Sequence, residues 1–133
     1  MPHLTRDQIL AKDDLRFEDV DVPEWGGSVR VRELRASERE VFERRVFAAG
    51  SAPSVSLPKT LGDLRVSLVV KCLVDPSTGS RLFKDEDAKD LNEKSATVIA
   101  RLFSVCSRIS GISQEVVDAV VGESEATTGG ASS

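Results

Sequence analysis

Few side chains in this sequence could do chemistry, and they stand far apart. The one histidine is His3, and the two cysteines, Cys72 and Cys106, lie in separate apolar stretches. An imidazole near the chain end has no partner held close enough for general base catalysis. One histidine and two distant cysteines cannot form a Cys/His zinc site. The sequence therefore predicts no catalytic residue, no metal site and no bound cofactor, which makes an enzyme the least favoured class.

Carboxylates do occur next to one another, at Asp13–Asp14 and at Asp85–Asp87. Calcium loops need ligands at set spacings and a glycine at the turn, and Asp85–Asp87 offers neither. Acidic residues are common at helix N-termini, where they complement the helix dipole, and on solvated surfaces. We therefore interpret both groups as structural or solvated. The chain also lacks a nucleophile elbow, a glycine-rich phosphate loop and a His-Glu-x-x-His pattern.

Composition argues against three further classes of protein: nucleic-acid-binding, membrane-spanning and exported proteins. The 133 residues carry a formal net charge of −4, and a mildly acidic protein gains nothing from counterion release on nucleic acid. No run of about 18 apolar residues occurs, so no membrane span is expected. The N-terminus lacks the apolar core of a signal peptide. Two cysteines in apolar surroundings then predict free, buried thiols in a reducing cytoplasm rather than a disulfide.

Turn residues and alternation predict an N-terminal β-hairpin. A capping box at Thr5–Gln8 opens a short helix. A strand is expected over 15–22, with a bulge near Glu18–Asp19 where the alternation changes phase. The stretch 23–27, with its proline and paired glycines, reverses the chain, and a second strand follows over 28–34.

The remaining residues are mostly helical by pattern. Capping residues are expected at Ser37, Thr60, Asp85, Ser95 and Ser113. Residues 61–74 fit both strand alternation and helical spacing, and length and capping favour a helix. The fold class is thus α+β: an N-terminal β-hairpin packed on a mainly helical bundle of about four to five helices. We expect one domain over residues 1–121 and a disordered C-terminal tail over 122–133.

Two features favour contact with a protein partner. Trp25 is the only tryptophan and stands beside the Gly-Gly reversal, where packing onto its own domain competes with a partner contact. A valine cluster precedes the tail: Val116, Val117, Val120 and Val121. Docking of these valines in the core is the favoured account, and a partly exposed apolar groove for an amphipathic helix is the alternative.

Three stretches, in order, resemble phage tail assembly chaperones of long-tailed siphophages. They are the hairpin string 19–32 followed by the polar helix start 36–39, the middle segment 73–83 with its Gly turn and Leu-Phe pair, and the ending 122–127. The resemblance covers residues 9 to about 127. It implies an α+β protein of the infected host's cytoplasm that is absent from the mature virion.

The resemblance also implies partners. Such proteins coat the long helical tape measure protein and keep it soluble until tail tube subunits polymerise around it. Many are also made as a longer form by a ribosomal frameshift, and the extension recruits the tube protein. Self-association is a further expectation. The alternative from another class is a small structural virion protein of the tail or of head completion, which would stay in the finished particle.

Overall fold

The N-terminal hairpin is the central feature of the sheet. In the computed structural model, which describes residues 2–50 and 57–120, β1 (Phe17–Val22) pairs antiparallel with β2 (Gly27–Arg32) across the turn η1 (Pro23–Trp25). Gly26 has φ +79°, a value that favours glycine in this turn. The short strand β3 (Leu73–Val74) pairs with β2 and completes a three-stranded sheet in the order β1-β2-β3. The predicted hairpin is confirmed.

The predicted bulge near Glu18–Asp19 is wrong. Every residue of β1 has one partner in β2, from Phe17 opposite Arg32 to Val22 opposite Gly27. The change of phase arises because Phe17 faces outward, while Val20 and Val22 face the core. On the outer face the guanidinium carbon of Arg30 lies 3.9 Å from the centre of the Phe17 ring, a cation–π contact.

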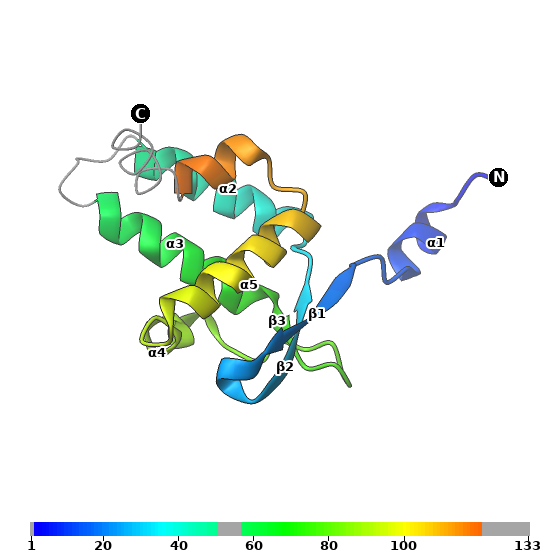
Figure 1. Cartoon of the computed structure of the whole chain (residues 1–133). Coiled ribbons are helices and arrows are strands. Elements are labelled where there is room, and N and C mark those ends of the chain that lie inside the picture. Colours follow the sequence, from blue (N-terminus) through cyan, green and yellow to red (C-terminus); the bar gives the residue numbers. More distant parts are fainter. Residues whose placement is uncertain (1, 51–56, 121–133) are drawn as a thin grey trace.

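Three long helices form the bundle that covers the sheet, with short helices at its margins (Figure 1). They are α2 (Ala36–Gly50), α3 (Leu57–Cys72) and α5 (Ala96–Ile109). The shorter elements are α1 (Arg6–Ala11), η2 (Asp85–Asp87) and α4 (Ala88–Leu91), and residues 114–120 are also helical. α3 packs against both α2 and α5, and α5 also contacts β1 and β2. The predicted α+β class, a hairpin on a helical bundle, is confirmed.

The segment 61–74 fits both a helix and a strand by its sequence pattern, and a helix is predicted. Residues 61–72 are helical, which confirms that prediction, and the last two residues of the segment form β3. The caps expected at Thr5, Ser95 and Ser113 are confirmed. α3 begins at Leu57, ahead of the expected cap at Thr60.

The expected capping box at Ser37 is wrong. α2 begins at Ala36, two residues before the start that a cap at Ser37 requires, and the Glu38 carboxylate accepts the backbone N–H of Arg35 at 2.8 Å. Asp85 likewise does not cap, because the Asp87 side chain accepts the N–H of Lys84 at 2.8 Å.

One apolar cluster joins the sheet to the three long helices. Leu64 and Leu68 of α3, Leu102 of α5 and Val31 of β2 are almost fully buried in it. The rings of Phe42 and Phe103 lie 6.4 Å apart and connect α2 to α5. Cys72 and Cys106 are buried and free, as predicted. The boundary expected at residue 121 and the tail 122–133 lie outside the described residues.

α1 lies apart from this core. It buries none of its residues, and Leu4, Ile9 and Leu10 are exposed. Figure 1 shows α1 separated from the bundle at the N-terminal end of the chain. Its local stabilisation comes from the Thr5–Gln8 capping box.

Candidate functional site

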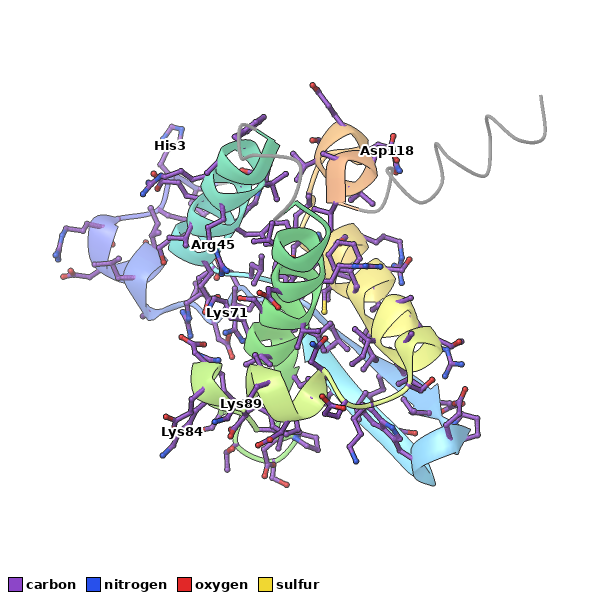
Figure 2. All side chains as sticks on the ribbon, turned by 90° about the vertical axis from the view of Figure 1, so that its left-hand side faces the viewer. His3, Arg45, Lys71, Lys84, Lys89 and Asp118 are labelled. Carbon is purple, nitrogen blue, oxygen red and sulfur yellow. The ribbon has the colours of Figure 1, made fainter. Side chains whose placement is uncertain are left out.

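Two adjoining hollows run along α3 and α5. Arg65 of α3 and Ala100 of α5 line both of them. We therefore treat them as one feature, the α3–α5 groove, with parts of about 120 and 580 Å³. Its described lining residues are Arg65, Val66, Asn92, Lys94, Ala96, Ile99, Ala100, Phe103, Ser104, Ser107, Arg108, Ile112, Gln114 and Val117. In Figure 2, α3 faces the viewer with α5 beside it.

The sequence of α5 gives the groove its shape. Apolar residues at i, i+3 and i+4 turn one face of α5 into the core, so that Ile99 and Phe103 are buried. Ala96, Ala100 and Ser104, four residues apart, are exposed on the adjoining face. Small side chains leave a low ridge there, which allows the backbone of another helix to approach closely.

The groove contains one buried polar atom without a partner. Ser107 is only 3% exposed, and its hydroxyl oxygen has no hydrogen-bond partner among the described residues. A buried hydroxyl normally forms a hydrogen bond, because leaving it unpaired costs free energy. Ser107 therefore gives the groove an unused hydrogen-bonding group.

The charge of the groove is opposite to that of the whole chain. Arg65, Lys94 and Arg108 line it, and none of its described lining residues is Asp or Glu, whereas the chain has a net charge of −4. A neighbouring hollow, which shares Val66 and Asn92 with the groove, is lined by Asp63, Asp85 and Glu93. Arg108 is paired, since its Nη2 lies 2.7 and 2.8 Å from the two carboxylate oxygens of Glu18. Arg65 and Lys94 form no ion pair with any described residue.

The residues of the predicted valine cluster differ in burial. Val116 and Val120 are buried, at 6% and 2% exposed, and belong to the core cluster. Val117 is half-buried and lines the groove. Val121 lies outside the described residues.

Trp25 lies away from the groove lining, at the hairpin turn, and is 37% exposed. Its neighbour Glu24 accepts two hydrogen bonds from Arg101 of α5, at 2.9 and 2.7 Å. These bonds, with help from the backbone, lower the pKa of Glu24 to about 2. The turn that carries Trp25 is thus fastened to α5.

Most of the described charged side chains outside the groove lie on the solvated surface, as expected for polar residues without a catalytic role. Figure 2 labels Arg45, Lys71 and Lys89, which come from α2, α3 and α4 and line a shallow hollow together with acidic residues. Asp85 accepts from Arg81 at 2.6 Å and from Lys71 at 3.2 Å, and both bonds hold its pKa below the ordinary value. Within the described residues, no group of three His, Cys, Asp or Glu side chains is placed to hold a metal ion.

Sequence reasoning missed Arg65, Lys94 and Ser107. They come from α3, the loop before α5 and α5 itself, so no local motif joins them. The spacing of Ala96, Ala100 and Ser104 on an otherwise apolar helix was the available signal.

The chain is thus an α+β domain with a groove beside α3 and α5 that has a basic edge. The chain belongs to the phage tail assembly chaperone family, whose sequence model matches residues 5–120. The chain also resembles a solved structure, that of the bacteriophage HK97 tail assembly chaperone. That similarity has a TM-score of 0.61 and 20% sequence identity, over 77% of this chain and 94% of that one. No curated protein sequence matches significantly. None of the described helices is long and apolar enough to cross a membrane.

Proposed function

We propose that this chaperone binds the tape measure protein and keeps it soluble in the host cytoplasm while a phage tail is assembled. Binding is non-catalytic, and the chaperone leaves before the virion is complete. Family membership supports a role in tail assembly. The observation that carries the proposal is the α3–α5 groove, which combines an apolar floor with a basic edge.

The groove is suited to a client that must be released. Its floor offers limited apolar surface, because Phe103 and Ile112 are largely buried in the chain's own core. Small interfaces of mixed polarity are typical of transient rather than permanent complexes. A chaperone needs this weaker binding, because the tail tube subunits must later replace it on the client.

Two further parts of the proposal concern other contacts. A longer, frameshifted form recruits the tail tube protein through its C-terminal extension. Copies of the chain also associate with one another. The exposed apolar residues Leu4, Ile9 and Leu10 around α1 favour self-association, since these side chains pack on nothing in the described core.

Co-expression tests the main proposal. The tape measure protein of the same phage is produced in bacteria with and without this chain, and its soluble fraction is measured. A clear rise in soluble tape measure protein supports the proposal. Equal precipitation in both cultures contradicts it.

Mass spectrometry of purified virions separates the chaperone from a structural tail or head-completion protein. The proposal predicts that peptides of this chain are missing from intact particles and present in the lysate of infected cells. Stoichiometric amounts in finished particles would favour the structural alternative.

A further inference from the structure

We infer that the α3–α5 groove receives an amphipathic helix of the client, with carboxylates along the edge that faces Arg65 and Lys94. The inference rests on the proposed function and deepens it, because it states the chemistry by which the client is recognised. Three independent features of the groove carry it: its shape, its charge and the unpaired hydroxyl of Ser107.

Shape favours a helix as the occupant. The groove follows α5, whose 14 residues extend about 21 Å at about 1.5 Å per residue. The exposed small residues Ala96, Ala100 and Ser104 form a straight ridge of low side chains. A helix of about four turns can lie along this ridge with its apolar stripe toward Ala100 and Val117.

Charge favours an acidic edge on that helix. Arg65 is half-buried and lines both parts of the groove, and Lys94 is exposed and lines the smaller part. Neither has an ion-pair partner among the described residues, while Arg30, Arg32, Arg101 and Arg108 all do. A helix that places Asp or Glu along one edge, one or two turns apart, would provide partners for both cations.

Ser107 favours a polar group on the same helix. Its hydroxyl is buried and unpaired among the described residues. A carboxylate or side-chain amide oxygen that enters the groove would accept a hydrogen bond from the Ser107 hydroxyl, so binding would satisfy a group that the free chain leaves unsatisfied.

A nucleic acid fits the groove poorly. Base stacking on proteins uses exposed aromatic faces, and the only aromatic residue among the described lining residues is Phe103, which is 2% exposed. The net charge of −4 also opposes association with a polyanion.

Charge reversal is the first test. The full-length chaperone carrying Arg65→Glu, and separately Lys94→Glu, is titrated with a soluble helical fragment of the tape measure protein, and the dissociation constant is measured. Each reversal is expected to weaken binding by about tenfold or more, because it replaces an attraction by a repulsion. Lys89→Glu is the matched control: an exposed lysine on α4, outside the groove lining, without an ion pair among the described residues. It should bind like wild type.

Rescue makes the test specific. Exchanging the client's carboxylates for lysine should restore binding to Arg65→Glu, and circular dichroism should show every variant folded. If wild type and both groove variants bind equally well, the inference is overturned and the proposed function stands. If the wild-type chain does not bind the fragment at all, the proposed function itself fails. Retention of the chain on immobilised nucleic acid is measured in parallel. If Arg65→Glu loses that retention but binds the client fragment like wild type, the inference is also overturned.

Photo-crosslinking identifies the occupant directly. A benzoylphenylalanine residue replaces Ser104 in the full-length chain, or Lys89 as the control, and the crosslinked peptides are sequenced after irradiation with the client. The inference predicts crosslinks from position 104 to acidic, amphipathic client segments and none from position 89. Crosslinks from position 104 only to residues 121–133 of the same chain, or only to a second copy of the chain, would contradict it.

Discussion

Arg32 and Glu38 form a two-bond ion pair that joins the end of β2 to the first turn of α2. The Arg32 Nη atoms lie 2.8 and 3.0 Å from the two Glu38 carboxylate oxygens. Burial alone would raise the pKa of Glu38, but hydrogen bonds from Arg32 and from the Arg35 N–H outweigh it and lower that pKa. The pair therefore ties the end of β2 to the start of α2.

Removing one member of this pair is expected to destabilise the chain. Arg32→Met leaves Glu38 largely buried without its partner, which costs about 3–5 kcal/mol. Urea unfolding measures this loss. The double variant Arg32→Met with Glu38→Leu should recover most of it, because no unpaired charge remains. Equal stability of the single variant and wild type would show that the pair contributes little.

The Glu24–Arg101 pair predicts a pH dependence. The pKa of Glu24 lies at about 2 in the folded chain, below its ordinary value of 4.5. Because the folded pKa is the lower one, the stabilisation is fully present above pH about 4.5 and is lost as the pH falls toward 2. Titration of the Glu24 carboxyl carbon by NMR measures this pKa directly. Arg101→Gln should move the titration upward toward the ordinary value, and an unchanged titration would contradict the assignment.

Ser107 predicts opposite effects on stability and binding. Ser107→Ala removes the unpaired buried hydroxyl, so the free chain should be as stable as wild type or more stable by about 1 kcal/mol. The same variant should bind the client more weakly, because the hydroxyl is satisfied only in the complex. Thermal unfolding and a binding titration measure the two effects. A variant that loses stability would show that the hydroxyl already has a partner in the free chain.

The two cysteines should resist modification in the native chain. Burial, together with a hydrogen bond with Cys72, raises the pKa of the Cys106 thiol, and alkylation requires the exposed thiolate. Iodoacetamide at pH 8 should label neither cysteine in native buffer and both in urea. Rapid labelling without denaturant would place one of these thiols at the surface.

Removing α1 should leave the core intact. Because α1 buries none of its residues, a chain that begins at Asp13 should unfold within about 0.5 kcal/mol of wild type. Light scattering on the same two proteins tests self-association. A smaller mass without α1 would support the role proposed for Leu4, Ile9 and Leu10, and an unchanged mass would argue against it.

Local features of the fold could be predicted from the sequence, and features that depend on distant residues could not. The caps at Thr5 and Ser95 depend on neighbours within one helical turn, and both are confirmed. The expected bulge in β1 was wrong because the position of Phe17 depends on Arg30 in the next strand. The cap at Ser37 was wrong because Glu38 also pairs with Arg32, outside α2.

The same distinction explains the candidate site. Docking in the core was the favoured interpretation of the valine cluster, and Val116 and Val120 are buried there. Val117, a contact residue in the alternative interpretation, lines the groove. A hydrophobic cluster alone does not reveal which of its residues the core will cover. Arg65 could not be predicted for a similar reason, since only tertiary packing places it in the same groove as Ser107.

Suppression of aggregation tests the central claim most directly. Purified tape measure protein is diluted from denaturant into buffer with increasing amounts of this chain, and light scattering is followed over time. The account predicts that scattering falls in proportion to added wild-type chain until a defined stoichiometry is reached, and that the chain carrying both Arg65→Glu and Lys94→Glu has a much smaller effect. Scattering that does not depend on the wild-type chain would contradict the claim that it is a tape measure chaperone.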